Sequence, residues 1–201
     1  MKKLSLVLLL FFFIFKASAE ITYSSDPKMF ISELVNDAIK TLSDKTISIE
    51  EKRSFIENLA LKNVDIKALS LYTLGELRKS SDENDLNNYQ EIFQKYFLKS
   101  LTSRLTDYSS NKFEVISAEQ KSSVYTIVKS KIIANEKQPE IKIDWRVYTK
   151  NPDKPLIRDL IVEGLSLART QKEEFSSILN SNNNELSVLI AKLEEFINKY
   201  L

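Results

Sequence analysis

The amino-acid sequence predicts an α+β fold, in which helices wrap around one curved, four-stranded antiparallel sheet. Three observations support this prediction. Apolar residues recur every three or four positions over 26–108 and again over 168–200, as in amphipathic helices. Between these segments, over 112–167, apolar and polar residues alternate as in half-buried strands. The order of helices, strands and helices fits an antiparallel sheet whose apolar face is covered by helices.

The N-terminus has the three parts of a secretory signal peptide. Lys2 and Lys3 precede a nearly continuous apolar run over 4–15, and a small-residue cleavage site ends at Ala19. The apolar run is much shorter than the roughly 20 residues that a membrane-spanning helix needs. We therefore expect cleavage after Ala19, which leaves residues 20–201 as a single exported, soluble domain.

The composition argues against several classes of function. The chain of 201 residues has 29 basic and 28 acidic residues, so it lacks the basic excess of a nucleic-acid-binding protein. It contains no cysteine and no histidine, which removes disulfides, thiol catalysis and the commonest general base and metal ligand. Its two glycines cannot form a glycine-rich phosphate-binding loop.

Three helices are predicted in the first part of the domain from their N-terminal capping signals. Asp26 precedes a proline and opens a helix over 26–43. Ser48 and Glu51 form a capping box for a second helix, and Asp65 caps a third. All three carry an amphipathic pattern, so each is expected to bury one face.

A polar connector over 79–88 leads into a long helix that is predicted over 85–108. One stripe of this helix is large and apolar, with aromatic residues at several of its positions. The stripe consists of Leu86, Tyr89, Phe93, Phe97, Leu101, Leu105 and Tyr108. Such a stripe is typical of a helix that lies against the interior of a domain.

Four strands are predicted over 112–119, 122–134, 140–149 and 156–167. The third alternates most clearly and separates its residues onto two faces. The apolar face consists of Ile141, Ile143, Trp145 and Val147, and the other face of Lys142, Asp144, Arg146 and Tyr148. The fourth segment is the most apolar and is expected to be the most buried strand.

Two helices over about 168–180 and 184–200 close the chain, with an asparagine-rich turn between them. Neither an internal repeat nor a linker is visible in the sequence. Residues 20–201 are therefore expected to form one domain.

Catalytic candidates are few. Without histidine or cysteine, a nucleophile would be a serine or threonine activated by lysine. The pairs Ser25–Lys28 and Ser109–Lys112 have the S-x-x-K spacing, but such pairs arise by chance in a chain rich in serine and lysine. We therefore expect that the protein is not an enzyme.

Two carboxylates lie within the last predicted strand. Asp159 interrupts an apolar run, and a buried carboxylate needs a partner. Arg146, Arg158 and Arg169 are the candidate partners of such a carboxylate. A structural ion pair is the favoured interpretation over a general acid.

The segment 159–193 resembles the C-terminal signature of the MlaC family, the periplasmic phospholipid carriers of the outer-membrane lipid-asymmetry pathway. The signature is D-x-x-x-E-G-x-S, followed by a helix that ends in phenylalanine and a leucine-patterned last helix. The matching residues are Asp159, Glu163, Gly164, Ser166, Phe175, Leu186, Leu189 and Leu193. The resemblance extends over about 28–198, including Leu74 and Gly75, and departs from the family pattern at Leu77 and Lys172.

The resemblance implies a fold in which helices and a four-stranded sheet enclose an apolar pocket for phospholipid tails. It also implies a periplasmic location and two docking partners, an inner-membrane ABC transporter complex and an outer-membrane lipoprotein–porin complex. The transported ligand is phospholipid, and no metal or other cofactor is expected. The predicted lipid-binding residues are Leu69, Leu74, Leu77, Phe93, Phe97, Leu101, Tyr108, Val128, Ile132, Ile143, Trp145, Val147, Ile161, Leu165 and Leu189.

Two other functions stay open at this point. A periplasmic chaperone or adaptor would bind protein partners through its helical faces and would have a filled core and an exposed apolar patch. A Ser–Lys hydrolase would use one of the two serine–lysine pairs.

Overall fold

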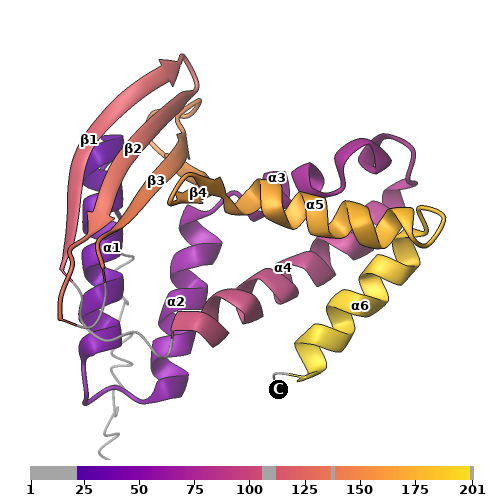
Figure 1. Cartoon of the computed structure of the whole chain (residues 1–201), viewed down its shortest axis with the longest axis horizontal. Coiled ribbons are helices and arrows are strands. Elements are labelled where there is room, and N and C mark those ends of the chain that lie inside the picture. Colours follow the sequence, from indigo (N-terminus) through magenta and orange to yellow (C-terminus); the bar gives the residue numbers. More distant parts are fainter. Residues whose placement is uncertain (1–21, 106–111, 137–138, 200–201) are drawn as a thin grey trace, which may run out of the picture.

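The structure is a computed structural model that describes residues 22–105, 112–136 and 139–199. The predicted signal peptide therefore lies outside the described residues. Within those ranges the chain forms six α-helices, one short 3₁₀ helix and five strands. Strands β1–β3 and helix α1 make one half of the molecule, and α3–α6 make the other, with α2 between them (Figure 1). No helix in the described part of the chain is long and apolar enough to cross a bilayer.

The first three helices begin where their capping signals predicted. They are α1 (Pro27–Ser43), α2 (Ile49–Asn63) and α3 (Ile66–Thr73). The Asp26 carboxylate accepts a hydrogen bond from the Met29 amide at 2.9 Å, and Asp65 accepts one from the Ala68 amide at 3.1 Å. Ser48 caps α2 in a full capping box, which satisfies amide groups that the first turn leaves without partners.

The apolar residues Ile66, Leu69, Leu74 and Leu77 predict a third helix that continues to Leu77, but α3 ends at Thr73. Leu74 follows it, and the 3₁₀ helix η1 (Gly75–Lys79) begins with a glycine at φ +59°. This left-handed backbone is accessible to glycine at little cost, and it stops the α-helix there. The long helix α4 (Glu83–Leu105) then starts within the predicted polar connector. Tyr108 lies outside the described residues.

The sheet is antiparallel with the order β1-β2-β3-β4-β5. The strands are β1 (Phe113–Ser122), β2 (Tyr125–Ile132), β3 (Ile141–Tyr148), β4 (Leu156–Val162) and β5 (Leu165–Ser166). The prediction of four strands is wrong, because the segment 156–167 is not one strand. The chain reverses at Glu163 (φ +49°) and Gly164 (φ +84°), and two residues pair back onto β4 as β5.

The two faces of the sheet have different environments. On the first, which we call the α1 face, α1 lies against β1 and β2, and its buried side chains form one cluster with those of β2, β3 and β4. The buried residues of this sheet cluster are Phe30, Ile31, Leu34, Val128, Trp145, Val147 and Ile157. The indole of Trp145 donates to Ser130 Oγ at 2.8 Å, and that hydroxyl donates to the Ile143 carbonyl at 2.8 Å. The polar groups of this core are therefore hydrogen-bonded.

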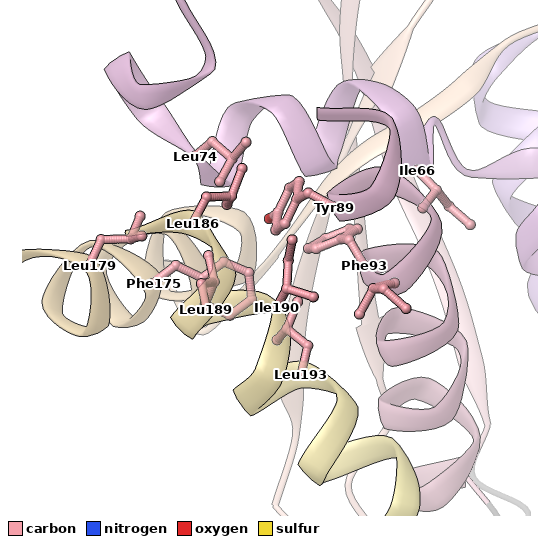
Figure 2. Packing of buried hydrophobic residues seen from close by; sticks show 11 residues of the cluster. Ile66, Leu74, Tyr89, Phe93, Phe175, Leu179, Leu186, Leu189, Ile190 and Leu193 are labelled. Carbon is pink, nitrogen blue, oxygen red and sulfur yellow. The ribbon is translucent and has the colours of Figure 1, made fainter. Parts of the chain in front are cut away.

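A second core, the helical cluster, lies among α3, α4, α5 (Leu167–Asn180) and α6 (Leu186–Lys199). Figure 2 shows its side chains converging from these helices. Its buried residues are Ile66, Leu74, Tyr89, Ile92, Phe93, Phe175, Leu179, Leu186, Leu189, Ile190 and Leu193. The Tyr89 hydroxyl is paired with Thr73 Oγ1 at 2.8 Å, so this aromatic side chain is both fully buried and hydrogen-bonded.

The α2–α3 junction joins the two halves at β4. Val64 forms a parallel bridge with Ile157, and the Asp65 amide donates to the Ile157 carbonyl at 2.9 Å. The Asp65 carboxylate is also paired with Arg158 at 2.7 Å. Helix α3 is thereby held beside β4, on the side of the sheet that faces away from α1.

Candidate functional site

A groove of about 1000 Å³ lies between α3 and the face of the sheet opposite α1. We call this second face of the sheet the groove face. Its volume is at the upper end of the range for small-molecule pockets, about 300–1,000 Å³. The groove is lined by Ala68, Leu69, Leu71, Tyr72, Arg78, Lys121, Ser122, Tyr125, Ile127, Lys129, Asp144, Arg146, Arg158, Ile161 and Ala168.

The two walls of the groove differ in chemistry. The wall from α3 is apolar and aromatic, with Leu69, Leu71 and Tyr72 among its residues. The sheet wall is mostly charged, because residues that alternate with the sheet cluster point to this side. In the strand register, Ile127 lies opposite Arg146 and Lys129 lies opposite Asp144. Overall the lining has five basic side chains and one acidic side chain.

Arg158 is firmly held at one end of the groove. Its Nε and Nη2 atoms contact the Asp65 carboxylate at 2.8 and 2.7 Å, and its Nη1 donates to the Tyr125 hydroxyl at 2.8 Å. Its guanidinium also lies 3.4 Å from the centroid of the Tyr148 ring. Burial lowers the pKa of Arg158, but the hydrogen bonds with Tyr125 and Asp65 outweigh burial and raise it. Arg158 is therefore a structural cation, with its donors already engaged.

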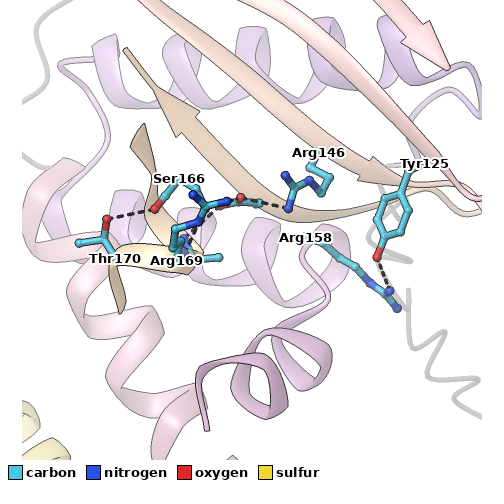
Figure 3. A network of polar contacts seen from close by, with 8 residues as sticks. Tyr125, Arg146, Arg158, Ser166, Arg169 and Thr170 are labelled. Atoms are coloured by element: carbon cyan, nitrogen blue, oxygen red, sulfur yellow. Dashed lines mark hydrogen bonds and ion pairs between the residues drawn. The ribbon is translucent and has the colours of Figure 1, made fainter. Parts of the chain in front are cut away.

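Arg146 is held by fewer contacts than Arg158. Its side chain is 41% exposed, and its Nη1 lies 3.5 Å from the buried Asp159 carboxylate. The sequence-based interpretation of Asp159 as one half of a structural ion pair is thus confirmed, with Arg146 as the partner. Figure 3 shows Arg146, with its contact as a dashed line, beside the Arg158–Tyr125 pair.

The other basic residues of the groove differ in their partners. Lys121 forms an ion pair with Glu119, and Arg78 donates to the Gly75 carbonyl at 2.6 Å. Lys129 forms neither an ion pair nor a hydrogen bond through its side chain within the described part of the structure. The described residues also contain no group of three or more acidic, histidine or cysteine side chains that could hold a metal ion.

The model of the family "MlaC protein" matches residues 32–195 of the chain. The chain belongs to the MlaC family. Among solved structures, the phospholipid-binding protein from Ralstonia solanacearum in complex with a phospholipid shares the fold of this MlaC-family chain, with a TM-score of 0.70 and 16% sequence identity. The match covers 85% of this chain and 96% of that one. A comparison with curated proteins finds no significant match.

The D-x-x-x-E-G-x-S signature of this MlaC-family chain builds the corner between β4 and α5. Asp159 accepts hydrogen bonds from the Ser166 hydroxyl at 2.7 Å and from the Ala168 amide at 3.0 Å. Ser166 is the N-cap of α5 and accepts from the Arg169 amide at 3.0 Å. The Glu163 carboxylate accepts a hydrogen bond from the Lys142 amide at 2.5 Å, where the pairing of β3 with β4 ends. In this chain, these polar contacts fix how α5 leaves the sheet.

The predicted lipid-binding residues of the MlaC-family chain fall into separate places. Leu69 and Ile161 line the groove. The residues on the α1 face of the sheet are Val128, Ile132, Ile143, Trp145 and Val147. The helical cluster contains Leu74, Leu77, Phe93, Phe97 and Leu189. Leu101 is half-buried on α4, Leu165 is 69% exposed on β5, and Tyr108 lies outside the described residues.

The charged and aromatic residues of the groove were not among the predicted site residues. Asp144 and Arg146 were placed on the polar face of the third strand and were not predicted to contact a ligand. Tyr125 and Ile127 alternate with the apolar residues of β2 in the same way. The mixture of aromatic, aliphatic and basic residues on this face was the available signal, because a fully solvated face rarely carries so many large side chains.

Of the two serine–lysine pairs, Ser109 lies outside the described residues. In the other, the Lys28 ammonium donates to the Ile116 carbonyl at 3.3 Å. Lys28 is thus directed toward β1 and away from the role of a base for Ser25.

Proposed function

We propose that this chain is a periplasmic phospholipid carrier, which buries acyl chains and passes lipid between an inner-membrane ABC transporter complex and an outer-membrane lipoprotein–porin complex. Membership of the MlaC family supports the proposal, and so does the shared fold with a protein crystallised with a phospholipid. The observation that carries it is the α1 face of the sheet, where predicted lipid-binding residues of β2 and β3 share one apolar surface covered by helices.

The acyl chains are assigned to the α1 face because the groove face is charged. A hydrocarbon chain laid along Lys129, Asp144 and Arg146 would displace water from these ionic groups, and desolvated charges are costly. On the α1 face, a chain meets Ile143, Leu160 and their aliphatic and aromatic neighbours. Each buried methylene contributes about 0.8 kcal/mol, so a sixteen-carbon chain gains on the order of 12 kcal/mol by leaving water.

Uptake requires the sheet cluster to open. Val128 and Val147 are fully buried against protein atoms, so a lipid chain reaches them only if α1 or a neighbouring helix moves from the sheet. We propose that docking at a membrane complex favours this open state and that lipid binding stabilises it in turn.

The first experiment measures the ligand of the protein purified from cells. Organic extraction and mass spectrometry are expected to find phospholipid in about stoichiometric amount, and the emptied protein is expected to take lipid from vesicles. An Ile143→Asp variant, which places a carboxylate on the α1 face, is expected to lose most of this lipid. Lys142→Asp is the matched control, because Lys142 is the neighbouring residue on the exposed groove face. A lipid-free protein that takes up no lipid from vesicles would contradict the proposal.

One observation favours the adaptor alternative. Leu165 on β5 and Leu167 at the start of α5 are large apolar residues, and they are 69% and 48% exposed. If they bind a protein partner, Leu165→Ser with Leu167→Ser will abolish capture of that partner and leave the lipid content unchanged. Loss of lipid in the same double variant would instead assign these residues to the carrier function.

A further inference from the structure

A second pocket, of about 600 Å³, lies between the end of α3 and the exposed side of α5, two helices that lie side by side (Figure 1). We call it the α3–α5 pocket. Tyr72 of α3 lines it, together with residues of α5 that include Arg169, Lys172, Ser176 and Asn180. Because this lining is almost entirely polar, the pocket suits a hydrophilic ligand, unlike the α1 face of the sheet.

The α5 residues of the pocket form a stripe along the helix. Arg169, Lys172, Ser176 and Asn180 recur every three or four positions, so they share one face of α5. At about 1.5 Å per residue, the stripe is about 16 Å long. It begins with two cations and ends with hydroxyl and amide groups. An extended peptide rises about 3.3 Å per residue, so about five of its residues cover the stripe.

Both cations of the stripe have capacity for an acidic partner. The Arg169 guanidinium forms neither an ion pair nor a hydrogen bond within the described part of the chain. The Lys172 ammonium forms no ion pair there either, and it lies 5.4 Å from the centroid of the Tyr72 ring. The Glu76 carboxylate, which Lys172 also attracts, is already paired with Lys79 at 2.6 Å.

The Lys172 side chain is held in place before any ligand binds. Gly75 has φ +59°, and a Cβ added there would lie 3.2 Å from Lys172 Cε, so the lysine stem passes closely over this glycine. A side chain that is already ordered loses less conformational entropy when it binds a carboxylate. Tyr72 is 39% exposed beside it, and tyrosine and arginine are the residues that often dominate binding energy at interfaces.

The spacing of the two cations fits carboxylates on an extended chain. Side chains three residues apart on a helix have Cβ atoms about 5–6 Å apart. Alternate side chains of an extended peptide point to the same side and lie about 6.6 Å apart. Acidic residues at alternate positions can therefore reach Arg169 and Lys172 together. Glu173, the acidic residue of the lining, offsets part of the positive charge but leaves a net excess.

We propose that the α3–α5 pocket is a docking site for an extended acidic segment of a membrane-complex protein, with two carboxylates of that segment on Arg169 and Lys172. The proposal rests on the proposed carrier function, because it gives the chemistry of one docking contact. A segment bound here contacts both α3 and α5. These helices are attached to β4 through Asp65 and Asp159, so docking at this pocket acts on the sheet.

Fluorescence anisotropy with a labelled peptide of alternating glutamate and serine tests the proposal on the purified protein. Arg169→Glu is expected to weaken binding at least about tenfold, which corresponds to about 1.4 kcal/mol. Lys172→Gln is expected to weaken it in the same direction. Lys192→Glu is the matched control, because it makes the same change of net charge at an exposed position of α6 outside the pocket.

The Arg169→Glu variant is expected to fold normally. Ser166 is the N-cap of α5, and a glutamate three residues after an N-cap serine completes a capping box. A loss of peptide binding in this variant therefore reports on the pocket. Unchanged affinity in both Arg169→Glu and Lys172→Gln would overturn the proposal, as would an equal loss in Lys192→Glu, which would reduce the binding to net charge.

Two further ligands separate charge from chain chemistry. The same peptide with glutamine in place of glutamate is expected not to bind detectably. An oligogalacturonate with the same number of carboxylates is expected to bind at least about tenfold more weakly, because its carboxylates are held on stiff sugar rings and not on alternating side chains. Equal affinity for the oligogalacturonate would assign the pocket to an acidic saccharide, and the peptide docking site would be wrong.

A failure of this docking site is distinguishable from a failure of the carrier function. Arg169→Glu is expected to keep its co-purified phospholipid, since the pocket and the sheet cluster share no residue. Wild-type protein that carries phospholipid but does not bind the acidic peptide would refute the docking site and leave the carrier function standing. Wild-type protein that binds the peptide through Arg169 but carries and takes up no lipid would refute the carrier function alone.

Discussion

Asp159 shows how one buried side chain fixes the direction of a helix. Its carboxylate is 1% exposed and contacts Arg146, while it accepts hydrogen bonds from the Ser166 hydroxyl and the Ala168 amide. These donors come from the turn and first residues that lead into α5. The side chain thus connects the sheet with the N-terminus of the helix that follows it, where a negative charge is also favourable.

Replacement of Asp159 by alanine is expected to lower the free energy of unfolding by about 2–4 kcal/mol, because two donors and a cation lose their partner. The partial exposure of Arg146 reduces the expected loss of unfolding free energy. Urea unfolding followed by circular dichroism measures this loss. Asp153→Ala, in the exposed turn before β4, is the control and is expected to change the value by less than about 0.5 kcal/mol. Equal effects of the two substitutions would refute this role for Asp159.

The hydrogen bond between Trp145 and Ser130 gives a second test at this scale. Ser130→Ala removes the acceptor of the indole N–H, and a buried donor without a partner costs about 1–3 kcal/mol. The protein has one tryptophan, so its fluorescence reports directly on this site during urea unfolding. Ser123→Ala, in an exposed turn, is expected to have no measurable effect. Wild-type stability in Ser130→Ala would show that the indole finds another acceptor.

At the scale of elements, the reversal between β4 and β5 depends on backbone conformation. Gly164 has φ +84°, and a Cβ added there would meet no atom within 4 Å. Gly164→Ala is therefore expected to cost only the left-handed backbone strain, about 1–2 kcal/mol, with no steric clash. Thermal unfolding measures this, with the exposed Lys150→Ala as control. A much larger loss would indicate a contact that the open space around Gly164 does not show.

The helix starts could be predicted because their signals are local. Asp26, Asp65 and the Ser48–Glu51 capping box each act on amides within three residues, and the structure has all three contacts. The fourth strand was predicted wrongly because apolar residues continue on both sides of the reversal. Only the glycine after Glu163 indicated a turn, and a single glycine within a strand pattern is weak evidence.

The candidate site could be predicted only in part. Alternation correctly assigned Trp145 and Val147 to one face of β3 and Arg146 to the other. It could not show that α3 lies over the second face, because that depends on the pairing of Asp65 with Arg158, 93 residues apart in sequence. Contacts between such distant residues leave no periodic trace in the sequence, so the groove became visible only in the fold.

At the scale of the whole molecule, the sheet cluster and the helical cluster are nearly separate. Among the described residues, Val64 is the one half-buried side chain that packs against both. Elements that share few buried contacts open as separate cooperative units.

Native-state hydrogen exchange is expected to resolve these two units. Val128 in β2 and Leu189 in α6 are both fully buried, yet the amides of these two residues are expected to exchange with opening free energies that differ by more than about 1 kcal/mol. A single shared value for both regions, equal to the global free energy of unfolding, would show that the molecule opens as one body.

The junction at Val64 and Asp65 has a mechanical consequence. It attaches the start of α3 to β4, and α5 leaves the other end of the same strand through the Asp159 corner. These two attachments of the helical half therefore converge on one strand. If the proposed carrier function is right, a membrane complex that binds the helical half can move β4 through these attachments. It can thereby cause lipid release without contacting the lipid.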